Sequence, residues 1–155
     1  MNRTIIKLFF YLCILTALPS YAQNAVHYYF KTMDIRNGLS QNTVYQILQD
    51  RKGFMWFGTK DGLNRYDGLS YRVYKKENSG LGKNFITALY EDHEGNIWIG
   101  TDGGVFIYNP VLDSFTAFNQ TSDKGTVIKD FVTMIGSDEY DNIWTVSYTH
   151  LTLPT

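Results

Sequence analysis

The sequence predicts an all-β fold made of repeated four-stranded units. A stretch that starts at Asp50 returns 42 residues later at Asp92, and a shorter copy starts at Asp138. Within each copy, runs of β-branched and aromatic residues end at turns that contain glycine. A period of about 40 to 45 residues is that of one blade of a β-propeller. We therefore expect a propeller fragment of two four-stranded blades and part of a third, preceded by a signal-peptide helix.

The first blade is assigned to residues 40–81 and the second to residues 82–127. The strands expected in them are 44–50, 54–59, 63–67 and 71–76, and then 86–92, 96–101, 105–109 and 115–119. Gly62 and Gly104 stand in the hairpins after the second strand of each blade, where a tight turn requires a positive φ angle. Residues 128–145 begin a third blade. The segment before the first blade is residues 23–39, and within it residues 26–33 are expected to form a lone strand.

The residues that recur between copies indicate packing between blades. A large ring at Trp56 would fill the wedge between adjacent sheets, and Gly58 would let a neighbouring backbone come close. Repeated positions in repeat proteins mostly serve the scaffold, so function is expected where the copies differ. The predicted structural repeat residues are Trp56, Gly58, Thr59, Gly62, Trp98, Gly100, Thr101, Gly104 and Trp144.

Residues 1–22 have the three parts of a secretory signal peptide. These parts are a cationic start at Arg3 and Lys7, an apolar run over 8–18, and the small residues Ser20 and Ala22. The apolar run is shorter than the ~20 residues that a membrane-spanning helix needs. We expect cleavage before Gln23 and a periplasmic mature chain. The single cysteine, Cys13, lies within the leader, so the mature chain is expected to have neither a disulfide nor thiol chemistry.

Charge and composition argue against several kinds of site. Loss of Arg3 and Lys7 leaves 12 of the 14 basic residues against 15 acidic ones, and no basic cluster occurs, so no nucleic-acid contact is expected. His27, His93 and His150 are isolated from one another and from any mature cysteine, so neither a metal site nor a cofactor is expected.

The acidic residues also do not predict catalysis. Asp61 with Asp67, or Asp102 with Asp113, would have to lie about 5 to 9 Å apart across a sugar to cleave a glycosidic bond, and the sequence does not place them so. Turn formation accounts for each. No catalytic residue is assigned.

A sugar-binding surface typically combines aromatic rings with polar side chains on loops. Four residues near strand ends or turns could point to the opening of a propeller ring: Tyr45, Asn64, Arg65 and Tyr90. Most tyrosines are expected to pack between blades, and no individual ligand contact is assigned.

The runs 38–42, 50–59, 62–68 and 95–101 closely resemble two-component regulator propeller repeats. The resemblance extends over about residues 26–145. It implies the periplasmic sensor of a hybrid two-component histidine kinase that detects an oligosaccharide and controls transcription of glycan-utilisation genes. It also implies an inner-membrane anchor and a homodimer in the full-length protein. No phosphoacceptor motif or nucleotide-binding box occurs in this chain, so this segment itself is expected to have no kinase activity.

The resemblance stops where the third copy departs from the pattern. After Trp144 the Gly-Thr pair is missing, and residues 146–155 are interpreted as a non-native tail at the end of a truncated reading frame, with a divergent natural blade as the alternative. Two other functions remain open. One is an exported propeller enzyme, such as a polysaccharide lyase or glycosidase, and the other is a protein-binding scaffold.

Overall fold

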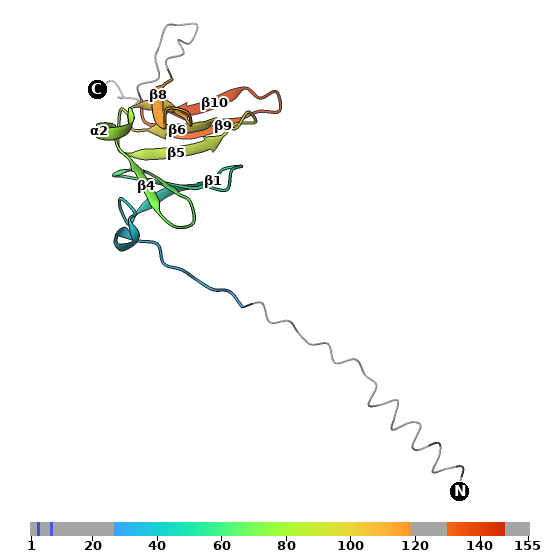
Figure 1. The fold of residues 1–155 in the computed structure, drawn as a ribbon. Helices are drawn as coiled ribbons and strands as arrows, with labels where there is room; N and C mark the ends of the chain where they lie inside the picture. Colours follow the sequence, from blue (N-terminus) through green and yellow to red (C-terminus); the bar gives the residue numbers. More distant parts are fainter. Residues whose placement is uncertain (1–2, 4–6, 8–26, 119–129, 148–155) are drawn as a thin grey trace, which may run out of the picture. The chain divides into compact units, whose positions relative to one another are not determined.

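The computed structural model describes Arg3, Lys7 and residues 27–118 and 130–147. The chain divides into a unit of residues 1–31 and a unit of residues 32–155 (Figure 1). The expected signal-peptide helix and cleavage site fall almost entirely outside the described residues. Within the described part of the chain, no helix is long and apolar enough to cross a membrane.

The second unit contains two antiparallel four-stranded sheets, as the repeat predicts. The first has the order β1-β2-β3-β4, with strands Val44–Gln49, Met55–Thr59, Gly62–Tyr66 and Tyr71–Tyr74. The second has the order β5-β6-β7-β8, with strands Ile86–Glu91, Ile97–Thr101, Gly104–Asn109 and Ser114–Ala117. A β-bulge lies at the same place in both sheets, near the start of β1 and of β5. The repeat therefore extends to backbone irregularities.

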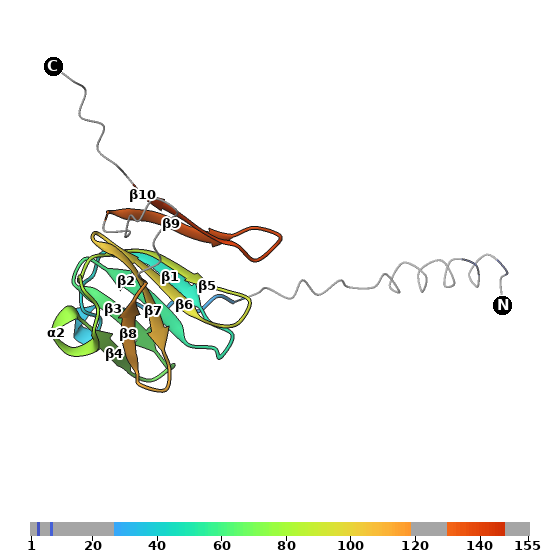
Figure 2. The ribbon, with the colours of Figure 1, turned by 90° about the horizontal axis from the view of Figure 1, so that it is seen from above.

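The third copy forms a two-stranded hairpin. Strands β9 (Val132–Ser137) and β10 (Ile143–Ser147) pair antiparallel, and Figure 2 shows them beside the sheet that holds β5 and β6. β10 includes the first two residues of the predicted tail, 146 and 147, and the rest of the tail lies outside the described residues.

Two short helical turns lie in segments outside the sheets. A 3₁₀ turn, η1 (Ile35–Asn37), precedes the first sheet, and α2 (Lys76–Ser79) follows β4. Asp34 caps η1 by accepting the amide hydrogen of Arg36 at 2.8 Å. The connection after η1 then packs Leu39 against Phe57 on the first sheet.

The expected strand at residues 26–33 is not formed over its described part, residues 27–33. Residues 27–34 have no regular secondary structure, and none of the three sheets includes them. A strand needs a neighbouring strand for its hydrogen bonds, and the aromatic and β-branched composition that suggested one here does not supply that neighbour.

The sheets are arranged as wedges. The first two approach most closely along β1 and β5, and β5 also lies against β9. Farther out, aromatic side chains fill the widening space: the Trp56 and Tyr108 ring centroids are 5.0 Å apart, and those of Tyr74 and Phe115 are 5.2 Å apart. These residues belong to a continuous core between the sheets, and Trp98 belongs to a second core against Val132 of the hairpin. The predicted packing of the repeated tryptophans between blades is confirmed for Trp56 and Trp98.

Candidate functional site

Each repeat is organised by an aspartate that binds its own hairpin and its own tryptophan. In the first copy, Asp50 accepts the amide hydrogens of Lys52 and Phe54 through Oδ1 and the indole N–H of Trp56 through Oδ2 at 2.7 Å. The sequence showed these aspartates recurring but did not show their bond to tryptophan. One side chain thus fixes both the β1–β2 turn and the orientation of the inter-sheet ring.

The later copies repeat this arrangement. Asp92 accepts the indole N–H of Trp98 at 2.7 Å, and Asp138 accepts that of Trp144 at 2.9 Å. The surroundings differ, because Trp56 and Trp98 are buried whereas Trp144 is 62% exposed. The local structure at Trp144 therefore forms without an inter-sheet core around it.

Acid is expected to destabilise the fold through these carboxylates. Burial raises the pKa of Asp92, but hydrogen bonds from Trp98 and Asn96 outweigh it and leave the pKa below its ordinary value. Hydrogen bonds from Asn142 and Trp144 lower the pKa of Asp138 to about 2. A carboxyl group with a lowered pKa in the folded state stabilises the fold above its unfolded value, about 3.9, and loses that contribution as the pH falls through the folded value.

We therefore expect the urea midpoint to stay level down to about pH 5 and to fall between pH 4 and pH 2. An Asp92→Asn variant should be less stable at neutral pH and show a smaller decrease in acid. A wild-type midpoint that is the same at pH 7 and pH 2.5 would contradict the assignment.

The repeated threonines and glycines close the β2–β3 hairpins. The hydroxyl of Thr59 donates to the Gly62 carbonyl at 2.9 Å and accepts the Asp61 amide hydrogen at 3.1 Å. The pair Thr101 and Gly104 makes the equivalent bond at 2.9 Å. Gly62 and Gly104 have φ angles of 116° and 126°, so the expected positive φ is confirmed at both positions.

The close approach at Gly58 and Gly100 involves side chains rather than a neighbouring backbone. A Cβ added at Gly58 would lie 2.7 Å from Cγ2 of Ile86, and one at Gly100 would lie 2.9 Å from Cγ1 of Val132. Ile86 and Val132 begin β5 and β9, the innermost strands of the next two sheets. Each glycine thus makes room for a β-branched residue of the following sheet. This corrects the expectation that a neighbouring backbone would come close there.

Three of the four residues considered for a ring opening form side-chain hydrogen bonds with other residues. Asn64 is fully buried and accepts the Ser40 amide hydrogen at 2.8 Å. The hydroxyls of Tyr90 and Ser137 lie 2.7 Å apart, which links the second sheet to the hairpin. Arg65 lies between the first two sheets. Tyr45 alone among the four is an exposed aromatic side chain, at 47%.

Arg65 belongs to a charged cluster that the sequence did not reveal. Its Nη1 donates to the Tyr108 hydroxyl at 2.5 Å and lies 3.6 Å from Asp113. Asp113 also pairs with Arg72 and accepts the Tyr74 hydroxyl hydrogen at 2.6 Å. Burial raises the pKa of Asp113, but hydrogen bonds from Tyr74 and Tyr108 and the two arginines together lower it. The cluster is a charged clamp between blades, and Ile107 stands at the position equivalent to Arg65 one repeat later.

A shallow groove lies next to this clamp, at the end of the sheets that holds the β1–β2 turns. Its volume is about 190 Å³, and its walls include Lys52, Phe54, Arg65, Glu91 and Pro110. With Asp50, which also lines the groove, the wall holds two acidic and two basic groups, and Arg65 is already engaged by the clamp. The groove therefore offers few free groups to a ligand.

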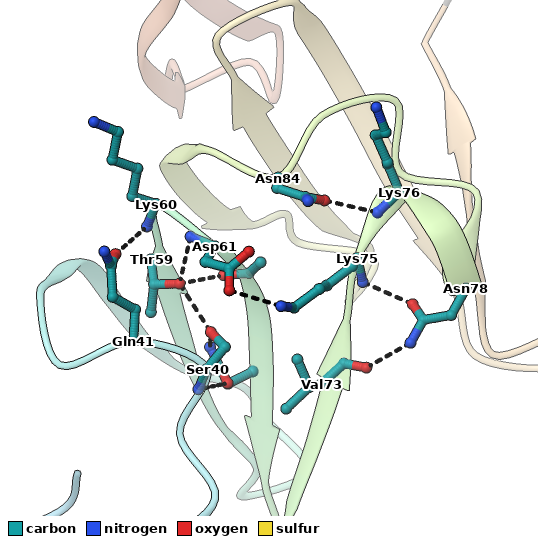
Figure 3. Close-up of polar contacts among 12 residues, drawn as sticks. Ser40, Gln41, Thr59, Lys60, Asp61, Val73, Lys75, Lys76, Asn78 and Asn84 are labelled. Carbon is teal, nitrogen blue, oxygen red and sulfur yellow. Dashed lines mark hydrogen bonds and ion pairs between the residues drawn. The ribbon is translucent and has the colours of Figure 1, made fainter. Parts of the chain in front are cut away.

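The opposite end of the sheets, which holds the β2–β3 turns, is linked by polar contacts between the sheets. Figure 3 shows the Lys75 ammonium group directed at Asp61, with Nζ 2.7 Å from Oδ2. It also shows the Asn84 side chain accepting the amide hydrogen of Lys76 at 2.8 Å. The Asn84 carbonyl accepts the Gly62 amide hydrogen at 2.8 Å. The Lys75–Asp61 contact lies within the first repeat, whereas the two bonds of Asn84 hold the segment that leads into β5 against α2 and the first β2–β3 turn.

Aromatic rings form a row at this same end. Tyr45 follows the first residue of β1, while Phe85 and Phe131 directly precede β5 and β9. The ring centroids of Tyr45 and Phe85 are 4.9 Å apart, and those of Phe85 and Phe131 are 5.7 Å apart, both edge to face. We call Tyr45, Phe85 and Phe131 the aromatic row. It crosses the innermost strands of all three repeats.

The residues considered for metal binding or acid–base chemistry lie apart or have other partners. Within the described ranges, no group of three or more His, Cys, Asp or Glu side chains is placed to hold a metal ion. Asp61 pairs with Lys75, and Asp67 accepts the amide hydrogens of Leu69 and Ser70 in its turn. Nδ1 of His93 lies 3.2 Å from Oδ1 of Asp141 on the hairpin.

Comparison with known proteins identifies the repeats. Residues 38–61 and 80–103 match the two-component regulator propeller. Over 59 residues, 38% of this chain and 4% of the relative, the chain is 42% identical to histidine kinase P4 of Formosa agariphila. The chain thus carries two-component regulator propeller repeats and resembles a histidine kinase over part of its length.

Solved structures agree with this identification. The extracellular domain of the hybrid two-component system BT3049 from B. thetaiotaomicron is 31% identical, with a TM-score of 0.65 over 76% of this chain and 17% of that one. The corresponding domain of BT4673 is 29% identical, with a TM-score of 0.59 over 67% of this chain and 15% of that one. The chain therefore spans less than a fifth of the length of these relatives.

Proposed function

We propose that this chain is an exported part of the sensor propeller of a hybrid two-component histidine kinase, and that the sensor detects an oligosaccharide. The observation that carries the proposal is the set of propeller repeats, which match a two-component regulator family and resemble extracellular domains of hybrid two-component systems. Ligand binding would favour one arrangement of the sensor over another, and that shift would pass to the kinase. The output would be transcription of glycan-utilisation genes.

The distribution of polar groups supports a binding module over the enzyme considered from the sequence. The acidic residues that could act in pairs are used in turns, in the Asp–Trp bonds and in the clamp around Asp113. Glycoside cleavage needs two carboxyl groups on opposite sides of a scissile bond. Aromatic rings are exposed at the β2–β3 turn end, where they could stack against a sugar.

Two experiments test the proposal. The chain expressed with its own leader in a Gram-negative host should appear in the periplasmic fraction with Gln23 at its N-terminus. The gene that encodes it should continue, in frame, into a transmembrane segment and a histidine kinase. A cytoplasmic, uncleaved chain, or a gene whose product cleaves a glycan and encodes no kinase, would overturn the proposal.

A further inference from the structure

The aromatic row differs from the other aromatic clusters because its rings reach solvent. Tyr45 is 47% exposed and Phe131 37% exposed, whereas Trp56 and Tyr74 in the inter-sheet core are at most 2% exposed. Aromatic rings that only fill the space between two sheets become buried. Exposed aromatic side chains that adjoin one another are a feature of binding surfaces.

The repeat shows that the row is not required for building a blade. Tyr45 stands where the second and third copies have Thr87 and Thr133, and Phe85 and Phe131, which share one repeat position, stand where the first copy has Thr43. A scaffold position would keep one residue type, as Trp56, Trp98 and Trp144 do. The row therefore occupies two repeat positions, neither of which keeps one residue type in all three copies, and function is expected at positions that vary between copies.

We propose that the aromatic row is the sugar-binding surface of this sensor, on which the pyranose rings of an oligosaccharide stack. This inference rests on the proposed function and names its contact residues. The C–H face of a pyranose ring packs against an aromatic face, and the hydroxyl groups at its edge need polar partners. The edge-to-face contacts at 4.9 and 5.7 Å hold the rings in place before ligand arrives, which lowers the entropic cost of binding.

The surroundings of the row supply those polar partners. Lys60 follows the last residue of β2 at the same end of the sheet, and Lys83 precedes Phe85 by two residues. The ammonium group of neither lysine forms an ion pair with any residue in the described ranges, so both are open to sugar hydroxyls. The alkyl chain of Lys83 lies against Gly103, where an added Cβ would be 2.6 Å from its Cε.

The groove at the other end of the sheets is a weaker candidate. Its aromatic walls include Trp56 and Tyr108, which are 1% and 7% exposed and so cannot offer a ring face to a sugar. Its guanidinium group, from Arg65, is held by Tyr108 and Asp113.

The test measures binding of the complete chain to a microarray of gluco-, galacto-, manno- and xylohexaose and hexagalacturonate, followed by titration of the probes that bind. Tyr45→Ala and Phe131→Ala should each weaken binding about fivefold to tenfold, and the double variant should weaken it further. Tyr45→Phe should bind like the wild type, because it keeps the ring. Ile47→Ala is the matched control, since Ile47 is 60% exposed on the same strand but pairs with Phe57, away from the row.

Circular dichroism of every variant shows whether the sheets persist. If the wild type binds a probe and both alanine variants bind it equally well, the aromatic row is not the binding surface, while the proposed function stands. If the variants lose affinity only in proportion to lost sheet structure, the row is again excluded. If the wild-type chain binds none of the probes, the proposed oligosaccharide sensor is itself overturned.

Discussion

Replacing Trp56 by alanine is expected to cost about 3 to 5 kcal/mol of unfolding free energy. The ring is 1% exposed and lies between the first two sheets, where it contacts Tyr74 and Tyr108. Its loss leaves a cavity in the inter-sheet core and removes the indole N–H that Asp50 accepts. A domain of this kind has only about 5 to 15 kcal/mol of total stability. Urea denaturation followed by circular dichroism measures the change.

Trp144 is the matched control for this variant. It holds the same position in the third copy and makes the same bond to its aspartate, at 2.9 Å, but it is 62% exposed. We expect Trp144→Ala to cost less than about 1 kcal/mol, because surface substitutions remove little packing. Equal losses for the two variants would mean that the Asp–Trp bond, and not burial between the sheets, determines the effect.

Gly62→Ala is expected to be the second severe change, at about 3 kcal/mol. The residue has a φ of 116°, and an added Cβ would lie 2.7 Å from the Tyr74 carbonyl oxygen. An L-residue at positive φ costs about 1 to 2 kcal/mol, and overpacking adds about 1 to 3 kcal/mol. The contact is with backbone of the adjacent strand, so it cannot be relieved by a side-chain rotation. The unfolding free energy of the purified variant tests this value.

The variant Gly53→Ala distinguishes the cost of a positive φ from the cost of the steric contact with Tyr74. Its φ is 88°, but an added Cβ there would have no atom within 4 Å. Gly53→Ala should therefore show only the backbone term, about 1 kcal/mol. If Gly53→Ala and Gly62→Ala have the same effect, the steric contact with Tyr74 is not what makes glycine necessary at the β2–β3 turn.

Much of the fold could be predicted from the sequence because the repeat places the same turn chemistry at the same offset. All eight strands of the two complete sheets lie within about two residues of their expected bounds. The positive φ at Gly62 and Gly104 followed from their place in short hairpins. The expected strand at 26–33 failed because composition shows what a segment tolerates, whereas strand formation depends on a partner elsewhere in the chain.

The candidate site was less predictable because its contacts join different repeats. Arg65, Tyr108 and Asp113 come from two sheets, and the periodicity that identifies a blade does not say which side chains meet between blades. Phe85 and Phe131 occupy equivalent positions 46 residues apart, yet their contact depends on how closely the innermost strands approach. The place of Tyr45 near a strand end can be predicted from the sequence, whereas its contact with Phe85 depends on the approach of β1 to β5.

The comparison between copies gives a physical reason why the strands could be predicted and the contacts of the candidate site could not. Positions that recur, such as Trp56 and Trp98, are used for packing that every blade needs. Positions that change, such as Arg65 against Ile107, are free to make contacts specific to one pair of blades. Sequence periodicity therefore predicts the shared packing of the blades well and the contacts specific to one pair of blades poorly.

In this fold the tryptophan-bearing faces of the two four-stranded sheets each pack on the sheet that follows. The most direct measurement is ¹⁹F NMR of the chain labelled with 5-fluorotryptophan, with a soluble paramagnetic agent added and the three signals assigned by Trp→Phe variants. The signal of Trp144 should broaden strongly, while those of Trp56 and Trp98 should stay sharp, in line with exposures of 62%, 1% and 8%. Equal broadening of all three signals would contradict the packing of the sheets as stacked wedges.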